Sequence, residues 1–408
     1  MNDMAKLAVW LDRNACERRW ALGMNVFELF IREILSYEGI PYREIDSADG
    51  LSPDIDIVVA AVTPEDRNTA QKVIEFARNG GTVISYGGLN CLARQLGYVH
   101  EADCGVGYAR GVFRDSDAEL PLRFLHAVPW VDDAGAETRV PASEYGSMER
   151  GAPGGQPLGP LVREFTVGHG RIVRWSVKVV DTIAGIQLGQ TPVLQDGPPA
   201  PDGSAAVDDG ILKTDDVYEL DWEFDRSTSP GTPYPYFQIP YADLWREALV
   251  GQLLECALRA GKTLPFLGRW PHPVSHVALI SLDSDHNIDE EALTALELLK
   301  QLQISTTWCI VEPGYHPSVY KRVVRGGHEL ALHFNAVKSE NREWSEQSFR
   351  DQTKWFRDAT GQSRIVSNKN HVTREEGWGD LFRWCEKEGI ASDQTRGPSK
   401  KGNGGFLY

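Results

Sequence analysis

The stretch Ser281-Leu282-Asp283-Ser284-Asp285-His286 stands at the end of an apolar run, Val277 to Leu282. That run has the length and the β-branched residues of a buried strand. Asp283 and Asp285 should therefore emerge together where the strand ends. In α/β proteins the carboxyl ends of strands are where active sites are built, so this stretch predicts a parallel sheet with a functional site at its edge.

Later segments of the chain repeat this arrangement. Gly327-His328-Glu329-Leu330-Ala331-Leu332 predicts a strand that is followed by His333. Residues 364–367 predict the next strand, with Asn368-Lys369-Asn370-His371 at its exit, and one strand later the chain reaches Asp393. Because carboxylates and histidines on neighbouring strand ends can share one ion, the pattern predicts a site for a divalent metal.

Together these segments resemble the polysaccharide deacetylase family, whose members are metal-dependent amidohydrolases on a distorted (β/α) barrel. The family places a catalytic-base aspartate just before a metal-ligand aspartate, and one subgroup has a single residue between the two. By this resemblance Asp283 is the base and Asp285 is a metal ligand. The resemblance covers roughly residues 272–408, about a third of the chain, and implies a divalent metal as cofactor, with zinc expected.

The second motif of the family is half present. It consists of Gly-His-Glu, a strand and then His-x-x-x-His, of which Gly327-His328-Glu329 and His333 are found, whereas the position four after His333 is Val337. His328 cannot replace the missing histidine, because five residues of extended chain span roughly 16 Å and put it at the opposite end of the strand. His333 is thus the ligand that this motif implies.

A third ligand could come from His371. After the next strand the family has an Arg-x-Pro motif, whose arginine orients the catalytic aspartate, and Lys369 falls near that position. Lysine offers a point charge rather than a planar fork. The alternative for His371 is a capping or surface histidine before a helix that starts at Thr373. Asp393 resembles the fourth motif of the family and would support Lys369 or the substrate.

The expected barrel is incomplete at its carboxyl end. Strands are expected near residues 277, 304, 329, 364, 390 and 405. The family needs one or two more strands and a closing Leu-x-Ile-His motif that supplies the general acid. An open apolar edge near residue 405 would be an aggregation hazard, so we expect another element, or a longer polypeptide, to cover it.

The amino-terminal part alternates short strands with amphipathic helices, which predicts a parallel sheet with helices on both faces. Strands are expected at 6–11, 42–45, 55–60 and 82–86, and helices at 25–38 and 68–79. The pattern resembles class I glutamine amidotransferase-like domains, which are flavodoxin-like. Enzymes of that type carry a nucleophilic cysteine on a strained turn, flanked by glycines. Cys91 follows Gly87-Gly88 without that context and without a downstream His-x-Glu, so we expect a domain that lacks catalytic residues.

The domain boundaries follow from composition and pattern. Further strands are expected at 111–114, 123–125, 171–177 and 183–188, with a glycine- and proline-rich loop at 151–160. The expected domains are 1–195, flavodoxin-like with this β insertion; 196–270, a linker with a helix at 243–260; and 271–408, the partial barrel. The fold class is therefore α/β throughout.

The amino-acid composition limits the classes of partner and the cellular location that we expect. The 408 residues are 41% hydrophobic and carry a net charge of −16, which argues against nucleic-acid or anionic-membrane partners. The six cysteines show no C-x-x-C spacing, no run has the length of a membrane span, and the first residues are too charged for a signal peptide. We expect a cytoplasmic protein with reduced thiols.

The leading hypothesis is a metal-dependent hydrolase of N-acyl (amide) bonds, a carbohydrate deacetylase. Two alternatives stay open. Val337 and the missing closing motif favour a catalytically inactive carbohydrate-binding or scaffold protein. The Asp-x-Asp form also occurs in family members that act on small cyclic amides. The expected partner is a carbohydrate or a small amide substrate; the sequence does not predict the oligomeric state.

Overall fold

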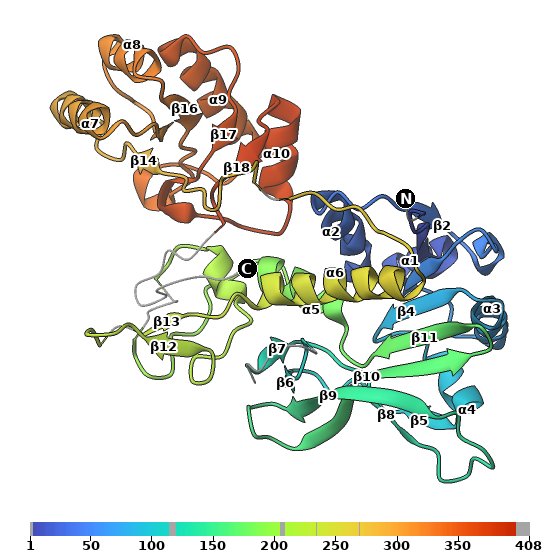
Figure 1. The fold of residues 1–408 in the computed structure, drawn as a ribbon. Helices are drawn as coiled ribbons and strands as arrows, with labels where there is room; N and C mark the ends of the chain where they lie inside the picture. The colour runs from blue at the N-terminus through green and yellow to red at the C-terminus, as the bar shows by residue number, and fades with distance from the viewer. Residues whose placement is uncertain (1–2, 114–119, 205–208, 234, 269, 397–408) are drawn as a thin grey trace.

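The computed structural model describes residues 3–113, 120–204, 209–233, 235–268 and 270–396. Two larger sheets organise this part of the chain (Figure 1). The first is mixed and lies in the amino-terminal half, and the second is parallel and lies in the carboxy-terminal third. The expected α/β class is confirmed at this level.

The mixed sheet has nine strands, in the order β2-β1-β3-β4-β11-β10-β9-β6-β7. Strands β2, β1, β3, β4 and β11 pair in parallel, and β11 to β7 pair antiparallel. The strands are β1 (Leu7–Leu11), β2 (Arg43–Ile45), β3 (Ile57–Val62), β4 (Thr82–Tyr86), β6 (Gly107–Arg110), β7 (Leu122–Phe124), β9 (Ala142–Arg150), β10 (Pro157–Val167) and β11 (Gly170–Trp175). Two short ribbons pair β5 (Tyr98–His100) with β8 (Trp130–Asp132) and β12 (Arg226–Thr228) with β13 (Pro235–Phe237).

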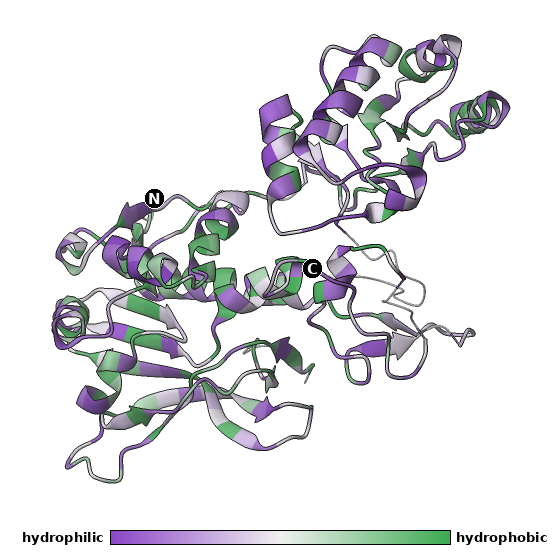
Figure 2. Cartoon of the chain, turned by 180° about the vertical axis from the view of Figure 1, so that it is seen from behind, coloured by the Kyte–Doolittle hydropathy of each residue, from purple (hydrophilic) through white to green (hydrophobic). Residues whose placement is uncertain are grey.

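Helices cover both faces of the mixed sheet. One hydrophobic cluster holds α1 (Arg13–Ala21), η1 (Phe27–Phe30), α2 (Ile31–Tyr37), α5 (Val179–Leu188) and α6 (Tyr241–Arg259). The other holds α3 (Arg67–Arg78) and α4 (Ala93–Leu96). Asp66 caps α3 by accepting from the Thr69 amide, and Ala70, Val73 and Ala77 turn its apolar stripe inward. Figure 2 shows the resulting alternation of hydrophobic and hydrophilic residues along the helices.

Helix α6 lies across the mixed sheet. Trp245 is fully buried there and its indole nitrogen donates to the Arg123 carbonyl at 2.7 Å. Leu249 and Leu253 lie in the same core. The short turns of this part are η2 (Ala48–Gly50), η3 (Asn90–Leu92) and η4 (Thr214–Val217). The division of the chain at residues 195 and 270 stays a prediction.

The parallel sheet has five strands in sequential order, β14 (Ser281–Asp283), β15 (Thr307–Ile310), β16 (Glu329–Leu332), β17 (Ser367–Asn368) and β18 (Ser392–Asp393). A helix follows each of the first four strands: α7 (Asp289–Leu302), α8 (Pro317–Arg325), α9 (Glu346–Thr360) and α10 (Asp380–Glu388), with turns η5 (Lys338–Glu340) and η6 (His371–Thr373). Their apolar faces form a separate core around Trp308, Leu332 and Phe334. This alternation places every strand exit at one edge.

Several expected elements are wrong in type or extent. Residues 183–188 belong to helix α5, because an apolar run buried on all sides has no period that distinguishes strand from helix. The strand expected at 111–114 is placed four residues too late, since β6 begins at Gly107 and ends at Arg110. Within the expected loop at 151–160, β10 begins at Pro157. No helix starts at Thr373; α10 begins at Asp380.

The apolar run before the acid pair is not a buried strand. Strand β14 begins only at Ser281, and Val277 and Leu279 are 57% and 73% exposed. The reason is that β15 begins at Thr307, which is the partner of Ser281, so the residues before it have no neighbouring strand to pair with. The expected strand near residue 405 falls outside the described residues.

Among the residues that the structure describes, no helix is both long and apolar enough to cross a membrane.

Candidate metal centre

The parallel register of the small sheet brings the predicted site residues to one edge. Asp283 is the last residue of β14, His333 follows β16 directly, and Lys369 follows β17 directly. Leu332 and Asn368 are partners in the register, so the exits of β16 and β17 lie side by side. His371 opens the turn η6 immediately afterwards.

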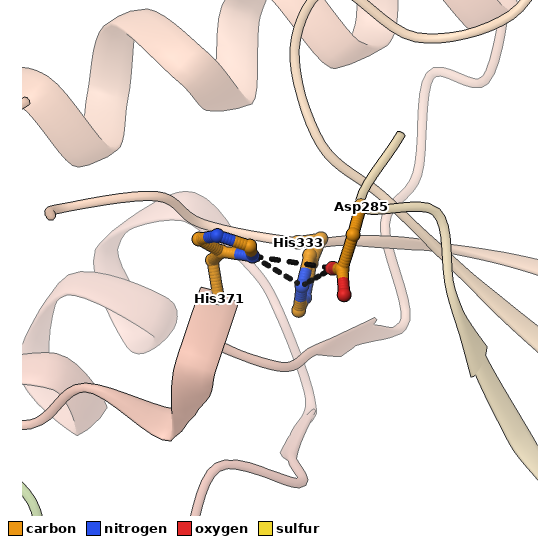
Figure 3. A group of neighbouring side chains, drawn as sticks. All are labelled: Asp285, His333 and His371. Atoms are coloured by element: carbon orange, nitrogen blue, oxygen red, sulfur yellow. Dashed lines mark hydrogen bonds and ion pairs between the residues drawn. The ribbon is translucent and has the colours of Figure 1, made fainter. Parts of the chain in front are cut away.

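Three of these side chains converge (Figure 3). His333 Nε2 lies 3.2 Å from Asp285 Oδ1, His371 Nδ1 lies 3.2 Å from the same oxygen, and the two ring nitrogens are 3.2 Å apart. Zinc bonds of 2.0–2.1 Å in tetrahedral geometry place ligand atoms about 3.3 Å from one another. The triangle therefore has the size of one face of a zinc coordination tetrahedron.

A hydrogen bond on the far side of the His333 ring and a carboxylate near the far side of the His371 ring indicate which nitrogens carry the proton when the rings are neutral. His333 Nδ1 lies 2.8 Å from the Lys369 carbonyl oxygen, which can only accept, so this nitrogen donates. His371 Nε2 lies 3.4 Å from the Glu340 carboxylate, which assigns the proton of a neutral ring to that side. In neutral imidazoles the converging nitrogens then present lone pairs. Only a second ring proton or a bound cation can satisfy three such acceptors, and metal-binding histidines are held by this kind of partner.

The acid of the triangle is suited to bind a cation. When the two rings are protonated, a hydrogen bond from His333 and then the charges of His333 and His371 lower the pKa of Asp285 to about 2. Asp285 is therefore negatively charged at any pH in the neutral range. Its side chain is 47% exposed, whereas that of His333 is 1% exposed, so the site opens to solvent on the side of the acid.

Asp283 faces a different partner. Its Oδ2 lies 2.8 Å from Lys369 Nζ, so the structure brings together the expected base and the lysine that was matched to the orienting arginine. Ser284, between the two acids, is buried; its Oγ accepts from the Val311 amide at 2.9 Å and contacts Asn287 Oδ1 at 3.0 Å. This anchoring turns Asp283 and Asp285 toward different neighbours.

Asp393 is connected to the Asp283–Lys369 pair through Asn368, the residue before Lys369. Its Oδ2 accepts from Asn368 Nδ2 at 2.7 Å, and its Oδ1 accepts from the Thr395 amide at 2.8 Å. Burial raises the pKa of Asp393, against the effect of these hydrogen bonds. The acid thus supports the residue before Lys369, and its expected role toward Lys369 or substrate stays a prediction.

The other histidines of this region lie elsewhere. His328 stands before β16, where its Nδ1 accepts from the Thr306 amide at 3.1 Å, and burial lowers its pKa. Val337, at the position of the missing second histidine, is 5% exposed. Its amide donates to Asn335 Oδ1 at 2.9 Å, which turns the chain away after His333.

One residue at the centre, Glu340, carries no signal that a strand pattern could reveal. Glu340 contacts His371 and also accepts from Asn335 Nδ2 at 2.8 Å. It lies in η5, seven residues beyond His333, in a loop without periodicity. Its closeness to His371 comes only from the pairing of β16 with β17.

The amino-terminal half of the chain places Cys91 where its thiol is held in the protonated form. The residue with a left-handed backbone after Gly87-Gly88 is Leu89, with φ of 56°, and it is buried. Cys91 follows two residues later, and its amide donates to Glu65 Oε2 at 2.7 Å. Burial first, and then the Glu65 carboxylate, raise the pKa of the Cys91 thiol to about 12.

A scan of protein-family models and a search of curated proteins found no match to this chain. Among solved structures it is similar to a β-galactosidase from Rahnella sp. R3, with 16% identity and a TM-score of 0.32 over 43% of this chain and 29% of that one. It is also similar to a CE4 family pseudoenzyme from Bacillus anthracis, with 14% identity and a TM-score of 0.24 over 30% of this chain and 44% of that one. The chain thus spans less than a third of the length of the β-galactosidase, and likenesses at such TM-scores do not establish a shared fold.

Proposed function

We propose that the protein is a metal-dependent hydrolase of N-acyl bonds in carbohydrates. The observation that carries the proposal is the triangle of Asp285, His333 and His371 beside the Asp283–Lys369 pair. Two nitrogen ligands and one carboxylate oxygen are a donor set that zinc accepts in catalytic sites, which keep a fourth position for water or substrate. His371 would take the place of the second histidine of the family motif, where this chain has Val337.

A divalent ion held there would polarise the acyl oxygen and lower the pKa of water. Asp283 would accept the proton of the attacking water, because its carboxylate stands at the strand exit next to the ligand Asp285. Lys369 Nζ lies 2.8 Å from Asp283 Oδ2, and the other carboxylate oxygen would receive that proton. Glu340 and the Lys369 carbonyl would hold the two imidazoles in the orientation that binding needs.

The amino-terminal domain would be flavodoxin-like and without catalytic residues. Flavodoxin-like sheets have the strand order 2-1-3-4-5, and the parallel part of the mixed sheet runs β2-β1-β3-β4-β11. The apolar Leu89 at the strained turn and the high pKa of Cys91 support a non-catalytic, amidotransferase-like role. The carboxy-terminal part would be a partial (β/α) barrel that carries the chemistry.

The test is metal content followed by activity. The purified protein should bind about one zinc ion, measured by elemental analysis after dialysis. The zinc-loaded protein should then release acetate from acetylated amino sugars. Stoichiometric zinc with hydrolysis of small cyclic amides alone would move the proposal to that substrate class. A protein that binds acetylated sugar yet neither zinc nor any divalent metal would be the inactive binding protein instead.

A further inference from the structure

The turn that carries His371 is held in a rare backbone conformation. Val372 and Thr373 have φ of 50° and 52°, in the left-handed region. Both residues are β-branched, and such residues adopt this region only where the surroundings impose it. The candidate ligand therefore stands on a turn that needs anchoring on both sides.

The anchor on the first side lies within the carboxy-terminal unit. The His371 amide donates to the Phe334 carbonyl at 2.8 Å. Asn370 Nδ2 donates to the Arg374 carbonyl at 2.7 Å and closes the turn. Arg374 is buried, and its guanidinium contacts the Ala336 carbonyl and Glu376.

The anchor on the other side lies mainly in the amino-terminal half of the chain, with Leu212 just beyond its end. Val193 and Gly377 exchange two backbone hydrogen bonds, of 2.9 and 2.8 Å, and the Glu375 amide donates to the Leu212 carbonyl at 2.9 Å. The ring of Trp378 packs edge-on against Phe27 of η1, with centroids 5.7 Å apart. In Figure 1 the carboxy-terminal unit, coloured orange to red, meets the rest of the chain beside α2, which follows η1.

We propose that docking of Glu375–Trp378 on the amino-terminal half positions His371 and so sets the metal affinity of the site. Residues 375–378 follow the strained turn directly, so their position limits where His371 can lie. Val193, Leu212 and Phe27 are positioning residues in this sense, although they belong to a different unit. This inference rests on the proposed metal site and adds that its affinity is coupled to the contact between the two halves.

The test uses the full chain and zinc alone, with the dissociation constant measured by chelator competition. Trp378→Ala and Phe27→Ala should each weaken zinc binding about threefold to tenfold. This effect is smaller than that of removing a group that hydrogen-bonds a metal ligand directly, which typically weakens binding about 10- to 100-fold. The double variant should weaken it no more than either single one, because both remove the same contact. Trp378→Phe keeps a ring at the contact and should bind zinc within about twofold of the wild type.

Trp355→Ala is the matched control, because this half-buried tryptophan lies against Gly314 within the carboxy-terminal unit. Zinc affinities of the two docking variants that equal that of Trp355→Ala would overturn the coupling. Should Trp378→Ala fail to fold, Phe27→Ala carries the same test from the amino-terminal side. A wild-type protein that binds no zinc would contradict the proposed function itself, whereas unchanged affinity in the variants contradicts only the coupling.

Discussion

At the scale of single residues, the two acids of the site differ because Ser284 is anchored between them. Asp283 contacts Lys369, and Asp285 contacts the two histidines. The three residues are consecutive, yet the backbone hydrogen bonds of Ser284 with Cys309 and Asn287 separate the acids into two environments. The two acids therefore face different groups, one a lysine and the other a pair of histidines.

The first prediction concerns the ligands. Asp285→Ala and His333→Ala should each abolish stoichiometric zinc while the fold survives, because each removes one of three converging atoms. Elemental analysis and circular dichroism measure the two quantities. His328→Ala is the control: this histidine stands at the other end of β16, so its loss should cost stability and leave zinc bound. Wild-type zinc content in both ligand variants would sink the assignment.

The second prediction concerns the base. Asp283→Asn should retain zinc but lose turnover by about 10²- to 10⁴-fold, because an amide cannot accept the proton of water. The amide oxygen can still accept from Lys369, so the local geometry should persist. Acetate release from acetylated amino sugars is the measurement. Turnover by the variant within a few-fold of wild type would show that another group is the base.

At the scale of elements, helix α5 and the turn η3 after β4 each carry a group whose pKa is raised by burial, Asp181 and Cys91. Asp181 lies in the first turn of α5, only 8% exposed, and its Oδ1 has no hydrogen-bond partner among the described residues. Burial first, and then the nearby Glu28, raise its pKa from 3.8 to about 7. The folded protein thus prefers the neutral acid.

The third prediction follows from the sign of that shift. A carboxyl whose pKa is raised on folding contributes stability that is fully present below its unfolded value near 3.8 and is lost as the pH rises through about 7. Asp181→Asn should therefore raise the free energy of unfolding more at pH 8 than at pH 5, by about 2 to 3 kcal/mol. Denaturant unfolding at both pH values measures this. Asp243→Asn, a more exposed acid in the first turn of α6, reports the effect of the same substitution at the surface.

The fourth prediction concerns Cys91. With its pKa near 12, the thiol should react with iodoacetamide about 10³-fold more slowly at neutral pH than a small-molecule thiol. Site-resolved mass spectrometry follows the modification, and Cys91→Ser should leave any hydrolase activity unchanged. Fast labelling of Cys91 would instead favour an amidotransferase-like nucleophile.

At the scale of the whole molecule, the parallel sheet has an apolar edge. Val277 and Leu279 are exposed next to the edge strand β14, and Leu298 and Leu302 of α7 are exposed as well. Exposed apolar strand edges promote association between chains.

The fifth prediction tests this edge. Leu279→Lys should reduce light scattering of concentrated protein while changing the free energy of unfolding by no more than about 0.5 kcal/mol. Leu194→Lys is the matched control, because Leu194 is likewise 73% exposed but lies far from β14 in the sequence. Equal effects of the two substitutions would mean that added charge, and not the edge, controls association.

The sequence by itself predicted that Asp283, Asp285, His333 and Lys369 lie at one edge of a sheet, and it left His371 open between a ligand and a capping or surface histidine. Each stands at or just beyond a strand exit, and parallel strands place their exits at one edge of a sheet whatever the details of packing. It also determined that Cys91 lacks an activating context. These conclusions depend on local pattern and on one general property of parallel sheets.

Only the tertiary structure decided which of these side chains touch. Whether His371 caps a helix or faces Asp285 depends on the pairing of β17 with β16 and on anchors as distant as Val193. The same holds for Glu340, for the helix at 183–188 and for the unpaired run before Ser281, where burial and neighbouring strands decide between conformations that the local sequence allows equally. Contacts between segments far apart in the chain leave no periodic signal, so the triangle of Asp285, His333 and His371 could be recognised only from the fold.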